Sequence, residues 1–424
     1  MRSAVLLMTL AAGLAGQQYD LLLKGGRVVD PKNGIDEPRD VAVKDGKIAV
    51  VAAGLAASEA RTVLDVSGLV ITPGLVDIHV HLYSTTGVAN AWAGDDSVRP
   101  DDFSFRSGVT TMVDAGSAGW QNFGHFRETV IDRAQTRVFA FVNIARLGMM
   151  TQAAEQYEPD LVPAEVAKVA ARHRDVVVGV KTAHWQATTW TAVDRALEAG
   201  RLANIPIMVD FGFFKQERPY WQLVTEKLRP GDISTHFYRS CVPFLDENGK
   251  LYDYLGEARK RGVKFDVGHG AGSLVFRNAV PAVAQGLWPD SISTDLHKQS
   301  MNAGMMDLPT TMSKFLAMGM PLREVIAAST FKPAEIIHHP ELGHLTVGSA
   351  ADIAAFKILE GDFGFADSNG GQYRGRRRLL CELTVRAGKV TWDYNARTAV
   401  DYRTLGPAYG VREGEFIVPP PKKK

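Results

Sequence analysis

Short apolar runs alternate with amphipathic stretches through most of the chain. After residue 73, eight short runs, most of them apolar, have the length of buried strands. They cover residues 75–80, 109–114, 138–144, 176–181, 205–210, 232–236, 263–267 and 291–295. The stretches between them, such as residues 163–172 and 191–202, carry apolar side chains at helical spacing. Eight strand and helix units predict an α/β fold in which a parallel sheet closes into a TIM-type (β/α)8 barrel.

Both ends of the chain have a different pattern, with β-rich runs in place of strand and helix units. These runs cover residues 19–30, 40–52, 62–66, 351–358 and 380–392, and residues 44–47 (Lys-Asp-Gly-Lys) are typical of a hairpin turn. Because neither end is long enough for a good core, we expect both to form one small β-sandwich beside the barrel. The predicted division is 17–70 and 346–400 for the sandwich, 71–345 for the barrel and 401–424 for a C-terminal tail.

The first sixteen residues have the pattern of a secretory signal peptide. Arg2 precedes an apolar run, and Gly13 and Ala15 are spaced like the small residues of a cleavage site. Residues 1–16 are therefore predicted to direct the protein to the periplasm or out of the cell. The alternative is a cytoplasmic protein in which this segment is a buried strand or helix. No later stretch is long and apolar enough for a membrane span.

The charge balance narrows the classes of partner. The 424 residues include 48 Lys and Arg against 47 Asp and Glu, which gives no electrostatic case for a nucleic-acid partner. Only two cysteines are present, so a disulfide framework is excluded. A small-molecule substrate fits this composition, and the sequence leaves open whether the chain forms a homo-oligomer.

Two histidines close the first apolar run of the predicted barrel. His79 and His81 are one residue apart, so in a strand their side chains share a face and their imidazoles can close on one ion. An isolated pair of this kind is a weak metal signal. How strongly the pair indicates a metal site depends on which residues end the other predicted strands.

Charged residues end four later runs, and further polar residues follow close behind. Side chains at the C-terminal ends of barrel strands meet around one mouth, and histidine and carboxylate are good ligands for zinc. The predicted metal ligands are therefore His79, His81, Lys181, Asp210, His236 and Asp295. His269 and His297 follow the seventh and eighth runs and are candidates for substrate contacts. Arg239 and Arg146 are candidates for binding a substrate carboxylate, because guanidinium matches it with two hydrogen bonds.

With these residues, the chain resembles the amidohydrolase superfamily, and within it the dihydroorotase-like metallohydrolases that include deacetylases. The resemblance rests on residues 73–81, 108–116, 179–181, 235–236, 266–270, 290–297 and 348–353. It implies that His79 and His81 hold one metal ion, that a carboxylated Lys181 bridges two ions and that His236 holds the second. It also implies that Asp295 is both a ligand and the catalytic proton carrier.

These implied roles are chemically consistent. A lysine ammonium has no lone pair, so Lys181 can join a cation site only after it has become a carbamate, formed with CO₂. Two divalent ions polarise a carbonyl group and lower the pKa of a shared water towards about 7. Asp295 can accept the proton of that water and pass it to the leaving group. The predicted activity is zinc-dependent hydrolysis, by a metal-activated hydroxide, of the amide or ester bond of a small N-acyl or O-acyl carboxylate or cyclic amide.

Asp210 departs from the family pattern, in which the fifth strand ends in histidine. Three interpretations are open: Asp210 binds the second zinc ion in its place, His184 turns in to do so, or the second ion is weakly bound or lost. Two other functions are also open. One is dihydroorotase, against which an exported location counts, and the other is an impaired homologue with one metal ion that binds a small acid without turnover.

Overall fold

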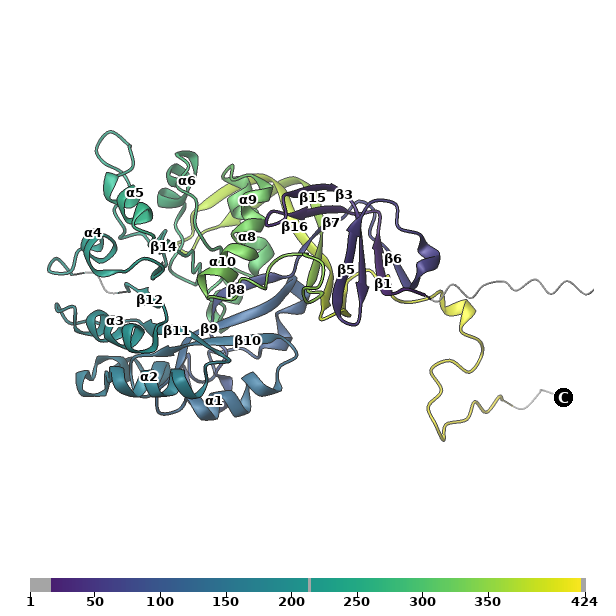
Figure 1. Cartoon of the computed structure of the whole chain (residues 1–424), viewed down its shortest axis with the longest axis horizontal. Coiled ribbons are helices and arrows are strands. Elements are labelled where there is room, and N and C mark those ends of the chain that lie inside the picture. Colours follow the sequence, from purple (N-terminus) through teal and green to yellow (C-terminus); the bar gives the residue numbers. More distant parts are fainter. Residues whose placement is uncertain (1–16, 213–214, 421–424) are drawn as a thin grey trace, which may run out of the picture.

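The middle of the molecule is a seven-stranded parallel sheet (Figure 1). The computed structural model describes residues 17–212 and 215–420, so the predicted leader lies outside the described residues. The strand order is β14-β13-β12-β11-β10-β9-β8. The strands are β8 (Leu75–Val80), β9 (Val109–Gly119), β10 (Arg137–Asn143), β11 (Val177–Thr182), β12 (Ile207–Asp210), β13 (Ile233–Thr235) and β14 (Lys264–Phe265). Every residue of β8, β9, β11 and β12 is buried, as in a parallel sheet that is covered on both faces.

The eighth predicted run closes this sheet without forming a regular strand. A parallel bridge joins Asp266, which follows β14, to Ser291, and a second joins Val80 of β8 to Leu296. The run predicted at residues 291–295 therefore lies between the first and last strands of the sheet. The result is a TIM-type barrel whose eighth position forms isolated bridges instead of a regular strand.

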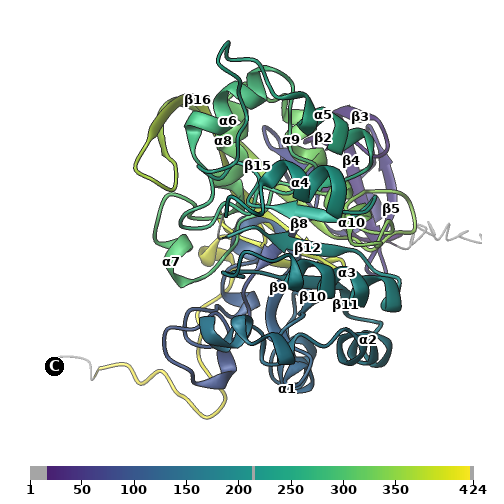
Figure 2. The ribbon, with the colours of Figure 1, turned by 90° about the vertical axis from the view of Figure 1, so that its left-hand side faces the viewer.

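Helices follow the strands along the chain and lie outside the sheet (Figures 1 and 2). They are α1 (Phe123–Thr129), α2 (Pro163–Arg172), α3 (Thr191–Ala203), α4 (Tyr220–Gln222), α5 (Asp253–Lys260), α6 (Phe276–Ala284), α7 (Lys298–Met301), α8 (Leu308–Ala317), α9 (Leu322–Ala327) and α10 (Phe331–Ile336). α2 and α3 confirm the helices predicted at residues 163–172 and 191–202. The buried face of α3 combines small residues, such as Ala196 and Ala199, with Val193 and Leu197.

Two further sheets lie at one end of the barrel and combine both ends of the chain (Figure 1). The four-stranded sheet has the order β5-β4-β1-β6, with β1 (Tyr19–Lys24), β4 (Asp40–Lys44), β5 (Lys47–Ala52) and β6 (Ala60–Asp65). The six-stranded sheet has the order β17-β16-β15-β7-β2-β3, with β2 (Arg27–Asp30), β3 (Ile35–Pro38), β7 (Val70–Pro73), β15 (Ile353–Ala366), β16 (Gln372–Arg386) and β17 (Lys389–Asp393). One hydrophobic cluster includes Leu23 and Val43 of the first sheet and Ile71 and Ile353 of the second. The boundaries at residues 70 and 345 stay predictions.

Local features follow the sequence closely in this part of the chain. Asp45 and Gly46 both have positive φ and join β4 to β5, which confirms the predicted hairpin turn. Asp352, just before β15, bonds to Arg137 of β10 and Arg386 of β16 and so ties the barrel to the six-stranded sheet. Among the described residues, no helix is long and apolar enough to cross a membrane.

Candidate metal centre

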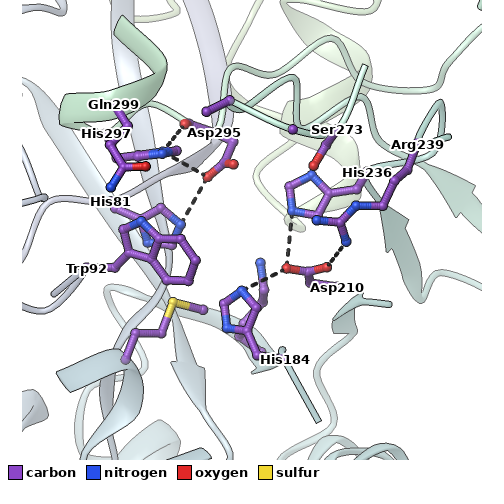
Figure 3. Close-up of a pocket in the computed structure, with 14 residues that line it drawn as sticks. His81, Trp92, His184, Asp210, His236, Arg239, Ser273, Asp295, His297 and Gln299 are labelled. Atoms are coloured by element: carbon purple, nitrogen blue, oxygen red, sulfur yellow. Dashed lines mark hydrogen bonds and ion pairs between the residues drawn. The ribbon is translucent and has the colours of Figure 1, made fainter. Parts of the chain in front are cut away.

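A small cavity of about 110 Å³ opens at the C-terminal ends of the barrel strands (Figure 3). Seven of the predicted site residues line it, namely His81, Lys181, Asp210, His236, Arg239, Asp295 and His297. Figure 3 shows two groups on opposite sides of the cavity, one around Asp295 and the other around Asp210. His79 lies fully buried beside the first group.

The first group has the geometry of a metal site. The Asp295 Oδ1 atom lies 3.1 Å from His81 Nε2 and 3.6 Å from His79 Nε2. Among the described residues, these three form the group whose ligand atoms all lie within 4.8 Å of one another. Atoms that bind one zinc ion tetrahedrally at 2.0 to 2.1 Å are about 3.3 Å apart. The donor set therefore fits a divalent ion.

Hydrogen bonds at Nδ1 orient the histidines. His79 bonds through Nδ1 to Thr235 Oγ1 at 2.8 Å, and His81 bonds to Ser117 Oγ at 2.9 Å. His236 donates from Nδ1 to a backbone carbonyl at 2.6 Å. These bonds favour the proton on Nδ1 and leave the Nε2 lone pair available for a metal ion, as metal-binding histidines require. Burial lowers the pKa of His79 to about 3, so this imidazole stays neutral and keeps its lone pair.

Lys181 extends from β11 towards the first group. Its Nζ atom lies 3.1 Å from His79 Nε2, and the side chain is fully buried. Burial lowers the pKa of Lys181, which favours loss of the proton that carbamate formation requires. Gly116 makes room for the lysine: it has a φ of +85°, and a Cβ atom there would overlap the Lys181 side chain.

The second group centres on Asp210. Its Oδ2 atom lies 3.2 Å from His236 Nε2 and 3.4 Å from His184 Nε2, while Oδ1 accepts a hydrogen bond from Arg239 at 3.1 Å. Burial would raise the pKa of Asp210, but His236 and Arg239 outweigh it and hold the pKa well below its usual range. Asp210 is therefore a carboxylate with basic groups at both oxygens.

Three residues of the cavity have left-handed backbone conformations, which are costly outside glycine. Asp295 has a φ of 50°, His236 of 57° and His184 of 54°. Such strain is kept where the surrounding structure demands it, and it often marks functional sites. Two of the three end barrel strands and were predicted as ligands, and the third, His184, was only an alternative.

The structure places two predicted substrate contacts away from the cavity wall. His269 is buried behind it and contacts Lys314 through Nε2 at 2.5 Å. Arg146 pairs with Asp160 at 2.9 Å and does not line the cavity. Arg146 is held instead by its ion pair with the Asp160 carboxylate. His297 and Arg239 do line the cavity.

Sequence reasoning missed three residues that shape the site. Trp92 stacks on His81 and His184, with ring centroids 5.6 and 4.6 Å away. Glu155 is buried against His184. Asp266 accepts hydrogen bonds from the Thr235 and Ser293 hydroxyls and lies 3.4 Å from His79 Nδ1. Asp266 had a usable signal, since it lies one residue before the end of the seventh run, whereas Trp92 and Glu155 come from segments without the periodicity of a strand or an α-helix.

Comparison with known proteins agrees with this geometry. Residues 274–376 match the amidohydrolase family. A deacetylase of Agrobacterium fabrum is 36% identical over 343 residues, which are 78% of this chain and 81% of the relative. A solved adenine deaminase structure has a TM-score of 0.79 and 30% identity, and covers 88% of this chain and 100% of its own. A solved dihydroorotase has a TM-score of 0.76 and 32% identity, and covers 87% of this chain and 98% of its own. With its histidines and aspartates gathered at a barrel mouth, the chain belongs to the amidohydrolase superfamily.

Proposed function

We propose that the chain is a zinc-dependent hydrolase that cleaves the amide or ester bond of a small N-acyl or O-acyl carboxylate or cyclic amide. The observation that carries this proposal is the group of His79, His81 and Asp295, which fits a divalent ion at the wall of a small cavity. The similar proteins named above are a deacetylase, an adenine deaminase and a dihydroorotase. Their similarity supports hydrolysis of amide bonds.

The residues divide the work of the reaction. A divalent ion bound by His79 and His81 would supply a Lewis acid for the carbonyl group and a water of lowered pKa. Asp295 accepts the proton of the attacking water and delivers it to the leaving nitrogen or oxygen. Burial would raise the pKa of Asp295, but His297 and His81 outweigh it and hold the pKa well below its usual range. The side chain is therefore an ionised acceptor before the reaction begins.

Arg239 and Lys181 complete the proposed site. Arg239 lines the cavity, and its guanidinium group has more N–H donors than the one that bonds to Asp210, so it can also hold a substrate carboxylate. Lys181 is proposed to be carboxylated, and its carbamate oxygens would then supply ligands for divalent ions. The cavity of about 110 Å³ suits a small substrate better than a peptide.

A substrate panel with zinc and bicarbonate tests this function. We expect turnover of N-acetyl amino acids or aryl acetates, and a KM that rises at least tenfold for carboxylate substrates in Arg239→Lys, because lysine cannot make the paired hydrogen bonds. Substrates without a carboxylate should show no such rise. Dihydroorotate belongs in the panel as the alternative reaction. Zinc-loaded protein that turns over none of these compounds would point to a binding protein instead.

We further propose that the protein is exported. The support is the apolar pattern of residues 1–16 with its small residues at positions 13 and 15. N-terminal sequencing of protein recovered after expression with the full leader should find a new end close to residue 17. Recovery of the intact N-terminus from the cytoplasm would contradict export and would restore the dihydroorotase alternative.

A further inference from the structure

A buried histidine and carboxylate pair lies at the cavity wall next to Asp210. His184 follows β11, and its Nδ1 atom lies 2.7 Å from Glu155 Oε2. Both side chains are almost fully buried, and Glu155 also accepts a hydrogen bond from Asn143 at 3.1 Å. A carboxylate at Nδ1 favours the proton on that nitrogen and directs the Nε2 lone pair the other way, a common support for metal-binding histidines. In this chain, the Nε2 atom of His184 points towards the cavity and Asp210 (Figure 3).

The distances at Asp210 match those of the first group. His184 Nε2 and His236 Nε2 lie 3.4 and 3.2 Å from the same oxygen, Asp210 Oδ2. Ligands of one tetrahedral zinc ion are about 3.3 Å apart. In the first group, the corresponding separations from Asp295 Oδ1 are 3.1 and 3.6 Å. Each imidazole is therefore as well placed towards Asp210 as the first pair is towards Asp295.

Arg239 offsets the negative charge of the Asp210 carboxylate. An aspartate in place of a neutral histidine adds a negative charge, which would weaken the Lewis acidity of an ion bound there. Arg239 contacts the other oxygen, Oδ1, at 3.1 Å. The pair of Asp210 and Arg239 is neutral overall, as a histidine would be, and Oδ2 is left towards the two imidazoles.

The backbone of His184 supports the same interpretation. Two other residues of the cavity have the same left-handed conformation. Asp295 belongs to the first proposed ion site and His236 to the second. A histidine held in this conformation by a buried carboxylate has a fixed direction into the cavity. Trp92 stacks on its ring and restricts it further.

We infer that His184, oriented by Glu155, supplies the imidazole of a second cation site together with Asp210 and His236. The inference rests on the proposed function for the first site. The imidazole that the fifth strand lacks would thus come from the loop after the fourth. Because this set is less compact than His79, His81 and Asp295, the two imidazoles must close towards each other to share an ion.

Metal counting on the purified full chain tests the inference without reference to activity. After loading with zinc and bicarbonate and removal of free metal, we expect two zinc ions per wild-type chain and one per His184→Ala chain. His338→Ala is the matched control, because His338 is also a left-handed histidine (φ 60°) but is exposed and outside the cavity. It should keep two ions. Glu155→Gln should keep the first ion and bind the second about 10 to 100 times more weakly, measured by zinc titration against a chelator.

A rescue variant separates a ligand role from a general effect on folding. Asp210→His in the His184→Ala background places an imidazole at the end of β12 and should restore the second ion. The inference is overturned if His184→Ala keeps two ions with unchanged affinity, or if the wild type binds only one. Turnover with a single ion would leave the proposed function intact and remove only the inference. Two bound ions without turnover on any substrate would support the second cation site and contradict the proposed function.

Discussion

Asp295 shows how much a single residue does in this cavity. Its carboxylate contacts His81 and lies 3.6 Å from the Nδ1 atom of His297, while its backbone carbonyl accepts a hydrogen bond from the same ring at 2.7 Å. Gly270 packs so closely that a Cβ atom there would overlap Asp295 Oδ2. The carboxylate is therefore fixed in place before any substrate arrives, which lowers the reorganisation needed during proton transfer.

Replacing this carboxylate tests its role as the proton carrier. Asp295→Asn keeps the shape but cannot accept a proton, so we expect kcat to fall about 10²- to 10⁴-fold. Steady-state kinetics and metal content should be measured on the same samples. Asp253→Asn, at an exposed site on α5, is the control and should change neither. Full activity in the Asp295→Asn variant would assign proton transfer to another group.

Gly116 gives a second test at the level of one residue. In Gly116→Ala the new Cβ would overlap Lys181 and would also sit at a φ of +85°, so we expect a loss of stability of about 2 kcal/mol or more and reduced metal binding. Gly124→Ala is the control, because no atom lies within 4 Å of its Cβ position and it lies in α1. Urea denaturation should show the control to be as stable as the wild type or slightly more so. Equal stability of the two variants would mean that the backbone adjusts freely at Gly116.

The sequence predicts the strand-end residues better than the loop residues, for a physical reason. Lys181, His236 and Asp295 end predicted strands, and the geometry of a parallel barrel brings such ends together whatever the path of the loops. Glu155 and Arg146 lie in segments without periodicity, whose path is set by contacts distant in sequence. Arg146 was therefore predicted near the cavity and lies elsewhere, and the pairing of Glu155 with His184 was not foreseen.

At the scale of elements, α8 is attached to the back of the cavity wall by one buried lysine. Lys314 Nζ contacts His269 Nε2 at 2.5 Å and the backbone carbonyls of Gly304 and Ala366 at 2.6 and 2.7 Å. Three acceptors match the three N–H donors of an ammonium group. The side chain thus joins α8, the loop after β14 and the end of β15. Burial lowers the pKa of Lys314 to about 7, against an opposing effect of Asp367 and Asp307.

This lowered pKa makes stability depend on pH. Between pH 7 and 10 the unfolded chain binds the Lys314 proton and the folded chain does not, so the free energy of unfolding should rise with pH across this window. We expect the contribution to be on the order of 3 kcal/mol, and Lys314→Met should lack it. Urea denaturation at several pH values measures the difference between the two proteins. Lys168→Met on the exposed face of α2 should follow the wild type, and parallel curves for Lys314→Met would mean an ordinary lysine pKa.

Elements with regular periodicity are predicted well, and the eighth barrel position shows the limit. α2 and β8 have the predicted bounds because their patterns of apolar residues are complete. The run 291–295 carries four polar residues, Ser291, Ser293, Thr294 and Asp295. Some of their side chains bind to residues in or next to the cavity. Ser293 bonds to Asp266 and Thr294 bonds to Asp77, so local demands replace the regular ladder with bridges.

At the scale of the whole molecule, Asp352 connects the barrel to the six-stranded sheet. It accepts hydrogen bonds from Arg137 at 2.6 Å, from Arg386 at 3.2 Å and from the backbone N–H of Ala387 at 2.8 Å. The aspartate is buried and both arginines are mostly so. Removing it would leave two guanidinium groups without their common partner, which is far costlier than losing a surface pair.

We expect Asp352→Ala to lower the free energy of unfolding by about 3 kcal/mol in a single shifted transition. The measurement is urea denaturation followed by both fluorescence and circular dichroism. Asp362→Ala breaks an exposed pair with Arg374 and should cost less than about 1 kcal/mol. Two separate transitions in Asp352→Ala would show instead that the barrel and the sheet unfold independently once this contact is lost.

The place of β7 between β2 and β15 also governs the order of events during synthesis. β7 ends at Pro73 and its partner β15 begins at Ile353, with the whole barrel between them. While a ribosome is still making the barrel, β7 has one edge with no strand to pair with, and the six-stranded sheet cannot be completed until nearly all of the chain has emerged. Under the proposed export, this late closure would keep the chain unfolded until it has crossed the membrane, since the last piece needed for a stable fold is also the last to be made.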